Sequence, residues 1–187
     1  LSGARIDEIA AKTRSSKRMI YYYFGDKDGL YLQSLENAYR TIRNGESDLD
    51  TNGLSPQDAL RRLVEFTFDH HHEHEEFIRM VMIENIHHGR HMQLSENIRG
   101  LNRLAIEALE AVLKRGQEAG LFREGLNPLE LHWQISALSF FNVSNAATFS
   151  FLFGDALFTP DGQETLSGHV ADMVLRYVRV EHGRPGA

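Results

Sequence analysis

The chain has 187 residues, of which 42% are hydrophobic and 25% charged, and these proportions are ordinary for a globular protein. It contains no cysteine, which excludes disulfides and thiolate metal sites, and no apolar run approaches the roughly 20 residues that a membrane-spanning helix needs. We therefore expect a cytoplasmic protein that has no membrane partner.

The net charge of −6 is divided unevenly along the chain. Residues 1–45 hold eight Lys and Arg against five Asp and Glu, so this part is basic and the rest of the chain is acidic. A segment that binds nucleic acid must neutralise phosphates, whereas a domain that binds a small effector need not. The division is what a basic DNA-binding end joined to an acidic effector domain would show.

Two short helices separated by a tight turn are predicted at the start of the chain. Apolar Ile6, Ile9 and Ala10 recur at helical spacing and predict a helix from Arg5 to Thr13. Ser16 follows after two turn residues, and its hydroxyl is placed to cap a second helix by accepting a backbone hydrogen bond. The two helices are therefore expected to lie close together.

The second helix is predicted to expose side chains suited to DNA. Ile20 and Phe24 lie four residues apart and share the buried face, so the polar residues beside them face solvent. Tyrosine and lysine suit phosphate oxygens, whereas side chains at the start of the helix can reach base edges. The alternative is a solvated amphipathic helix in which Tyr23 merely packs. The predicted DNA-binding residues are Arg5, Ser16, Lys17, Arg18, Met19, Tyr21, Tyr22, Tyr23 and Lys27.

This pair of helices has the form of a helix-turn-helix, whose second helix enters a major groove. The run IAAKTRSSKRMIYYYFGDKDGLY resembles the DNA-binding signature of the tetracycline-repressor (TetR) family. The features that carry the resemblance are the pair Ile9-Ala10, the capping Ser16, the hydrophobic and aromatic run Ile20 to Phe24, and Lys27. The resemblance implies one more helix ahead of these two, which we expect to be absent from this chain.

Two residues depart from the family pattern. Arg14 stands where the family usually has a turn glycine, so it must adopt a left-handed conformation or the turn must differ. Ser15 stands where the family usually has a valine, which removes an apolar contact. We therefore expect a DNA-binding unit that is less stable than is usual in the family.

A longer helix is predicted from its cap, Asp26, to Asn44, and it would connect the DNA-binding end to the body. The stretch Asn44 to Ser55 is polar, contains two Asn-Gly pairs and is predicted to be a loop. We place the domain boundary there. Residues 1–45 are expected to form the helix-turn-helix domain with its connecting helix, and residues 46–187 the effector-binding and dimerisation domain.

The second domain is predicted to be helical throughout, which makes the fold class all-α. One helix begins at Pro56, and the segment Phe77 to Ile86 is apolar on almost every side, which predicts a central helix wrapped by others. Further helices are expected over Leu101 to Leu113, from Pro128 to Phe153, and from Leu166 onward. No stretch alternates with period two for long enough to be a strand.

Polar residues interrupt two of these apolar helices. Glu84 and Asn85 must either bond to neighbours, with His88 one turn further on, or face a cavity that admits a polar ligand. The segment Trp133 to Asn145 mixes aromatic bulk with amides, as a pocket for a small aromatic or amphipathic molecule would, although aromatic stripes also occur in cores. The predicted ligand-binding residues are Glu84, Asn85, His88, Trp133, Phe140 and Asn142.

The histidines offer an alternative function. His70 and His74, and again His87 and His91, lie four residues apart and could share a helix face as zinc ligands do. Glu76 replaces the second histidine of the metallohydrolase pattern, and histidines near a helix C-terminus are also favoured by its dipole. We expect no metal site and no cofactor, and the alternative is a helical, His-rich protein that senses or binds metal.

The TetR resemblance implies a transcriptional regulator rather than an enzyme. Such a protein would be a homodimer that binds a near-palindromic operator in double-stranded DNA, represses transcription, and leaves the DNA when a small-molecule effector enters the second domain. The dimer contact is predicted on Pro128 to Phe153 and Leu166 to Val180, with Val174 in the seam. The sequence contains no glycine-rich phosphate loop and no Gly-x-Ser-x-Gly motif that would suggest catalysis.

Overall fold

The computed structural model describes residues 5–180, so the position ahead of the first predicted helix lies outside the described residues. Within this range the chain is all-α, as predicted, and its only β pairing is an isolated bridge between Phe122 and Arg179. The α-helices are α1 (Ile6–Lys12), α2 (Lys17–Phe24), α3 (Lys27–Ser47), α4 (Pro56–Glu73), α5 (Glu75–Ile86), α6 (Glu96–Glu118), α7 (Pro128–Ser144), α8 (Ala146–Phe153) and α9 (Pro160–Val178). Two short 3₁₀ helices, η1 (Met92–Leu94) and η2 (Ala156–Phe158), complete the fold.

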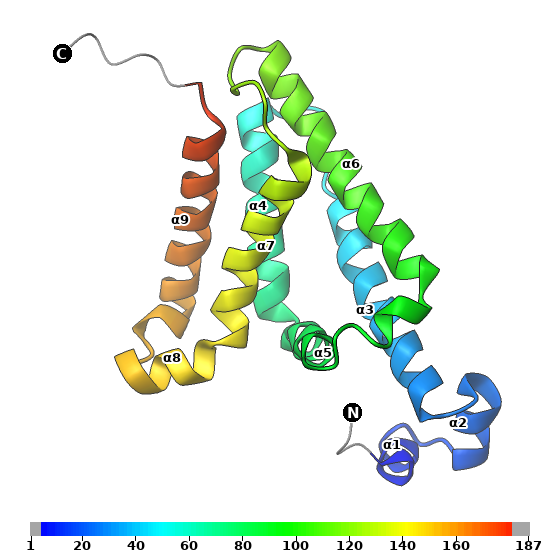
Figure 1. The fold of residues 1–187 in the computed structure, drawn as a ribbon. Helices are drawn as coiled ribbons and strands as arrows, with labels where there is room; N and C mark the ends of the chain where they lie inside the picture. Colours follow the sequence, from blue (N-terminus) through cyan, green and yellow to red (C-terminus); the bar gives the residue numbers. More distant parts are fainter. Residues whose placement is uncertain (1–4, 181–187) are drawn as a thin grey trace.

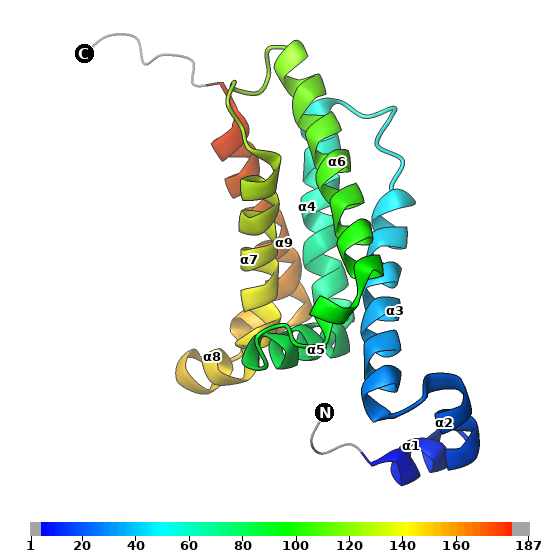
Figure 2. The same ribbon diagram turned by 45° about the vertical axis from the view of Figure 1, so that its right-hand side comes forward.

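The helices form a small end and a larger body. Figure 1 shows α1 and α2 together beyond the N-terminal end of α3, which leads from them along the side of the body. The body consists mainly of α4, α6, α7 and α9, with α4 packed against the other three. Figure 2 shows α5 lying across the end of this bundle that is nearer to α1 and α2.

The central helix of the body is α4. Ser55 caps it by accepting a hydrogen bond from the backbone N–H of Asp58 at 3.1 Å, and Pro56 occupies a first helical position, where its missing N–H costs nothing. Leu60 and Val64 are completely buried against α6, α7 and α9. The bundle is thus organised around this helix.

The prediction that Phe77 to Ile86 forms the central helix is wrong. This segment is the short helix α5, which buries Phe77 and Ile78 against α3 but leaves Ile86 70% exposed. The segment is apolar all round because one face meets α3 and another borders a cavity, described below. An apolar composition alone does not distinguish these surroundings from a fully enclosed helix.

The helix α3 is longer than predicted. Asp26 caps it, as expected, by accepting from the Gly29 N–H at 2.7 Å, but the helix continues past Asn44, and the loop begins only at Asp48. The glycine of the first Asn-Gly pair, Gly45, packs closely on α4, since a Cβ at this position would lie 2.6 Å from the ring of Phe66. The pair therefore serves helix packing rather than a turn.

The long helix predicted from Pro128 to Phe153 is in fact two helices. α7 and α8 meet at Asn145 with a bend of 65°, and α8 buries none of its residues. No single helix within residues 5–180 is long and apolar enough to cross a membrane, and the pair α7 and α8 reaches the length and composition only when its two bent halves are taken together.

The last helix, α9, begins at Pro160, earlier than predicted, with Thr159 as its cap. Val174 is only 4% exposed and packs in the core of its own chain with helices α4, α6 and α7. Its predicted place in a dimer seam is therefore wrong. Val174 lies next to Met173, which is 56% exposed, so an outward surface of α9 remains available.

Candidate DNA-binding and effector sites

The turn between α1 and α2 depends on local hydrogen bonds. Ser16 accepts from the Met19 N–H at 3.2 Å and so caps α2, as the sequence predicts. Arg14 has φ of 53°, so of the two alternatives for this turn it adopts the left-handed conformation. Thr13 closes α1 by donating its hydroxyl to the Ile9 carbonyl at 2.8 Å.

The second helix presents its polar and aromatic side chains to solvent. Ile20 is 4% exposed and anchors α2, whereas Tyr22 is 79% and Tyr23 63% exposed. The rings of these two tyrosines stand edge to face with centroids 5.2 Å apart. Side chains with so little contact to the protein are free to meet another molecule, and tyrosine hydroxyls suit phosphate oxygens.

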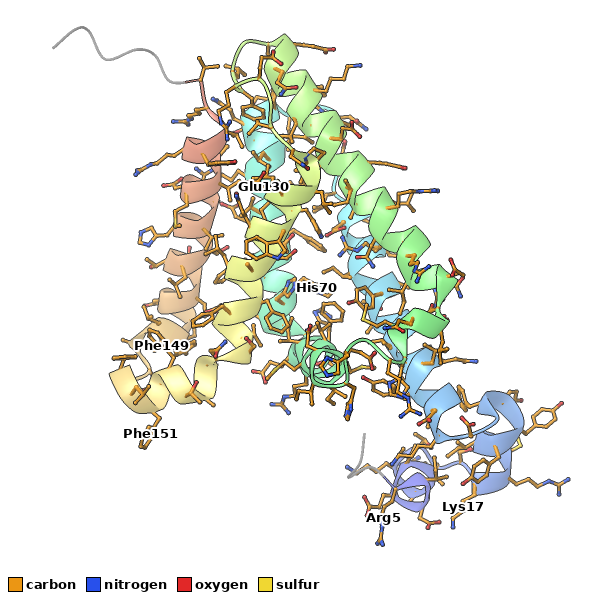
Figure 3. All side chains as sticks on the ribbon, in the orientation of Figure 1. Arg5, Lys17, His70, Glu130, Phe149 and Phe151 are labelled. Carbon is orange, nitrogen blue, oxygen red and sulfur yellow. The ribbon has the colours of Figure 1, made fainter. Side chains whose placement is uncertain are left out.

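All nine predicted DNA-binding residues lie at this end of the molecule. Figure 3 shows Arg5 and Lys17 at its outer surface, far from the body. Lys17 forms an ion pair with Asp7 of α1, so its ammonium group is already engaged in the free protein. Lys27 is partly buried at the start of α3, whereas Arg18 is exposed. Their role in DNA binding remains a prediction.

A cavity of about 350 Å³ that opens to solvent lies in the body and is lined by residues of α3, α4, α5, α6 and α7. Three of the six predicted ligand-binding residues, Asn85, Trp133 and Phe140, line it. The other lining residues are Tyr39, Arg43, Thr67, His71, Phe77, Val81, Asn102, His132, Ser136 and Ala137. Aromatic rings thus supply much of its wall, and amide, hydroxyl and imidazole groups supply polar points within it.

The structure places the remaining three predicted residues elsewhere. The carboxylate of Glu84 accepts hydrogen bonds from the backbone N–H groups of His91 and Met92, at 3.0 and 3.1 Å, so its buried charge is already satisfied. His88 is exposed in a left-handed turn with φ of 57°. Asn142 bonds to Gln163 of α9, donating at 2.7 Å. These three do not line the cavity.

The buried Glu84 instead braces α5 against α3. Its other oxygen lies 2.8 Å from Nδ1 of His91, whose ring stacks edge-on against Tyr31 of α3. The hydroxyl of Tyr31 donates to the Met80 carbonyl of α5 at 3.3 Å, and burial beside Glu84 raises the pKa of that hydroxyl. Of the two readings left open for Glu84, bonding to neighbours is correct, although the partner is His91 rather than His88.

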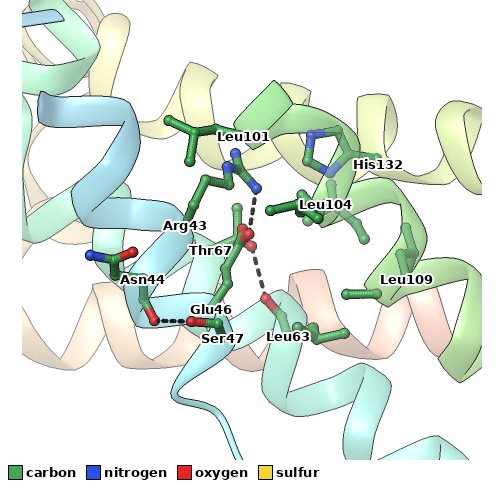
Figure 4. A pocket seen from close by; sticks show the side chains of 13 residues that line it. Arg43, Asn44, Glu46, Ser47, Leu63, Thr67, Leu101, Leu104, Leu109 and His132 are labelled. Atoms are coloured by element: carbon green, nitrogen blue, oxygen red, sulfur yellow. Dashed lines mark hydrogen bonds and ion pairs between the residues drawn. The ribbon is translucent and has the colours of Figure 1, made fainter. Parts of the chain in front are cut away.

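A second, smaller cavity of about 160 Å³ lies beside the first and shares Arg43, Thr67 and His132 with it. Figure 4 shows Arg43 reaching from α3 toward Leu104 and His132. Nη1 of Arg43 donates to the carboxylate of Glu46, one turn along the same helix. The side chains of this pair are 9% and 12% exposed, so a complete ion pair is buried in the cavity wall.

Charge inside the cavities is concentrated on this pair. Burial raises the pKa of Glu46, although the guanidinium of Arg43 opposes the rise. Burial, followed by the charge of Arg43, lowers the pKa of His132 to about 4, and burial also lowers the pKa of His71. Both imidazoles are therefore neutral near pH 7 and can donate or accept a hydrogen bond.

The sequence pattern did not identify Arg43, His71 and His132 as cavity residues. A signal was present for Arg43, because it follows Tyr39 by four residues and borders the apolar stripe of α3. Thr67 and His71 repeat this spacing on α4. A polar residue beside an apolar stripe faces a cavity only if the neighbouring helices leave one, which the pattern of a single helix cannot reveal.

The histidines do not assemble a metal site in the part of the chain that the structure describes. His70 and His74 stack face to face with ring centroids 4.0 Å apart, and His74 directs its Nδ1 to the His70 carbonyl. Burial lowers the pKa of His70 to about 4. His91 is bound to Glu84, and His87 is exposed.

The fold and its exposed second helix define a helix-turn-helix DNA-binding protein with a separate helical body. Residues 56–174 match the family model described as "Tetracyclin repressor-like, C-terminal domain". The HTH-type transcriptional repressor NicS of Pseudomonas putida is 34% identical over 178 residues, which cover 95% of this chain and 84% of that protein. The chain belongs to the tetracycline-repressor family of transcriptional regulators.

Solved structures share the fold. A bacterial regulatory protein of the TetR family from Rhodococcus RHA1 has a TM-score of 0.72 and 16% sequence identity, with 95% of this chain and 87% of that chain covered. The structure of AibR in complex with isovaleryl coenzyme A and operator DNA has a TM-score of 0.61 and 16% sequence identity, with 92% of this chain and 87% of that chain covered. At such identities these likenesses concern the fold.

Proposed function

We propose that this protein is a ligand-responsive repressor, which binds a near-palindromic operator as a homodimer and leaves it when a small molecule occupies the cavity of the body. The observation that carries the proposal is the position of α3. This helix begins directly after α2 and supplies Tyr39 and Arg43 to the cavity wall. A molecule in the cavity therefore contacts the same helix that holds the DNA-binding end.

An effector acts only if it binds two conformations of the protein with different affinity. The cavity is suited to this role because five helices line it, and a shift of α3 relative to the other four would change its shape. AibR, which has the same fold, was solved with both an acyl coenzyme A and operator DNA. That precedent supports a combined DNA and effector function for this chain.

Exposed apolar side chains support the proposed homodimer. Phe141 of α7, Phe151 of α8 and Met173 and Tyr177 of α9 are all at least 40% exposed. Figure 3 shows Phe151 pointing away from the body. Because a single groove-reading helix covers few base pairs, specific recognition requires two copies on half-sites spaced by a helical turn or a multiple of it.

The DNA-binding role is tested with duplexes that the full-length protein selects from a random library. A Lys17→Ala/Arg18→Ala double variant should bind the selected duplex roughly 100-fold more weakly, because it loses contacts at the groove-facing start of α2. The matched control is Arg103→Ala/Lys114→Ala, which removes the same charge from exposed positions of α6. Equal binding by the α2 double variant and wild type in fluorescence anisotropy would contradict the assignment of α2.

The effector role is tested with compounds that release the same duplex from the wild-type protein. Phe140→Ala should leave operator affinity nearly unchanged but weaken release, because Phe140 lines the cavity and its helix α7 lies far from α2 (Figure 1). Leu94→Ala is the control, since this leucine of η1 is 72% exposed and lines neither cavity. A compound whose release is affected by Leu94→Ala but not by Phe140→Ala would place the effector elsewhere.

A further inference from the structure

We propose that the effector is a small monoanion, whose carboxylate binds Arg43 and whose flat apolar body fills the aromatic part of the larger cavity. This inference rests on the proposed effector function and adds the chemical class of the ligand. The observation behind it is a buried hydrogen-bond donor without an acceptor. Nε of Arg43 is buried and has no hydrogen-bond partner among residues 5–180, although Nη1 of the same guanidinium is bound to Glu46.

A buried guanidinium with an unused N–H group is a place where an acceptor is missing. The five N–H groups of arginine form a planar fork that matches the two oxygens of a carboxylate. Leaving a buried donor unpaired costs free energy, and a ligand oxygen that reaches Nε as the side chains around it shift would remove that cost. Glu46 does not supply the acceptor while its carboxylate lies on Nη1, and no other residue among 5–180 does so.

The charged residues that line the cavities indicate a ligand with a single negative charge. Arg43 is the only lysine or arginine among the residues that line either cavity, and the one acidic residue among them, Glu46, is paired with it. The histidines His71 and His132 are neutral and add no charge. A dianion such as a phosphate monoester would bring more negative charge than these groups balance, whereas a carboxylate brings one.

The side chains that line the larger cavity indicate the shape and polarity of the rest of the ligand. Tyr39, Phe77, Trp133 and Phe140 surround the larger cavity with ring surfaces, which favour a flat or aromatic body. Asn85, Asn102 and Ser136 add neutral polar groups at its margin, which suit one additional polar substituent. A cavity of about 350 Å³ admits a compact molecule of this kind.

The test uses benzoate and phenylacetate, each compared with its neutral amide, benzamide and phenylacetamide. Trp133 is the only tryptophan in the chain and lines the cavity, so quenching of its fluorescence reports occupancy directly. At neutral pH the full-length protein should bind at least one of the carboxylates about tenfold more tightly than its amide.

The decisive variant is Arg43→Gln/Glu46→Gln, which removes both charges at once and so leaves neither of them buried alone. In this variant the ratio of the amide Kd to the carboxylate Kd should fall by about tenfold. The amide should still bind, which would show that the cavity is intact. Arg43→Lys keeps the charge but loses the planar fork of N–H groups. Its preference for the carboxylate over the amide should lie between that of the double variant and that of wild type. The control, Arg40→Gln, changes an exposed arginine of α3 and should behave as wild type.

Three outcomes of these binding measurements would overturn the inference. They are equal binding of carboxylates and amides, a carboxylate preference that survives Arg43→Gln/Glu46→Gln, and the absence of quenching by any of the carboxylates at millimolar concentration. A neutral compound that fills the cavity and releases the operator would leave the proposed function intact and overturn only the anionic class. Carboxylate binding that depends on Arg43 but never alters operator affinity would instead contradict the proposed function.

Discussion

The two ends of α3 lie in very different surroundings. At its N-terminal end, α1 and α2 bury only Ala10 and Ile20 and present cations and tyrosines to solvent. At its C-terminal end, Ile42 is 1% exposed, and Arg43 lies in a cavity wall to which five helices contribute. One end is thus shaped by hydrogen bonds between near neighbours in the sequence, and the other by packing between distant segments.

This difference indicates which parts of the molecule tolerate amino-acid substitution. Exposed side chains of α2 can be replaced with little effect on folding, so they are free to be selected for DNA recognition. Residues around the cavity belong to the core and, in the proposed function, also contact the ligand, so a substitution there would alter both.

A charge introduced into the body should have the largest effect. Val174→Asp buries a carboxylate without a partner in the core and should lower the free energy of unfolding by about 3–5 kcal/mol. Met173→Asp, its neighbour on α9, places the same charge on a residue that is 56% exposed. The exposed variant should sediment as a monomer and, at a protein concentration where wild type is also monomeric, unfold in urea like wild type. Similar urea midpoints for the two variants would contradict the difference in burial between Val174 and Met173.

Acid should destabilise the body through its buried histidines. Burial lowers the pKa of His70 and His132 to about 4, below the value of about 6.5 in an unfolded chain. The stability these neutral rings contribute is present above about pH 6.5 and is lost as the pH falls toward 4, because only the unfolded state then takes up protons. Urea unfolding near pH 5 should show a loss of about 1–2 kcal/mol for each histidine relative to pH 7.

The control for this effect is His132→Gln, whose unfolding free energy should depend less steeply on pH than that of wild type. Residues 1–45 contain no histidine, so this effect belongs to the body. A pH dependence that is unchanged in His132→Gln would mean that His132 titrates normally in the folded state.

Two glycines should respond to alanine in opposite directions. A Cβ at Gly45 would lie 2.6 Å from the Phe66 ring, so Gly45→Ala should cost about 1–2 kcal/mol while α3 and α4 separate slightly. Gly100 in α6 has no atom within 4 Å of such a Cβ, and Gly100→Ala should stabilise the protein by about 0.5–1 kcal/mol. Thermal unfolding of the two variants decides the point, and stabilisation by both would show that α3 and α4 are not closely packed at Gly45.

The smallest effect is expected from a single phosphate contact. Lys27→Ala should weaken binding a few-fold on every duplex and reduce the slope of log affinity against log salt by about one. Lys114→Ala removes an equal charge from α6 and should leave the slope unchanged. If Lys27→Ala altered which sequence is preferred, this lysine would read bases rather than hold a phosphate.

Features that depend on near neighbours could be predicted from the sequence. The caps Ser16, Asp26 and Ser55 are found where they were expected, because a cap involves only residues three positions apart. The left-handed Arg14 was one of two alternatives that the family resemblance left for this turn. The helix-turn-helix, a local motif, was therefore accessible from the sequence together with the all-α class.

The cavity could be predicted only in part. Glu84 bonds to His91 because the chain reverses through Gly89, with φ of 70°, and no helical periodicity describes such a turn. The burial of Arg43 depends on α4, α6 and α7 together, and Val174 faces the core rather than a partner because α9 packs on α4. These arrangements are set by how helices pack, which the periodicity of one helix does not specify.

The unbroken course of α3 has a mechanical consequence. The part of this helix between Lys27 and Arg43 is roughly 24 Å long at the α-helical rise, so it can act as a lever. A tilt of about 5° at its Arg43 end would move the Lys27 end by roughly 2 Å. In a symmetric pair the two recognition helices would change their separation by up to about 4 Å, against half-sites spaced by about 34 Å. In the proposed function, a small rearrangement around the ligand would thus be magnified into a misfit with the groove.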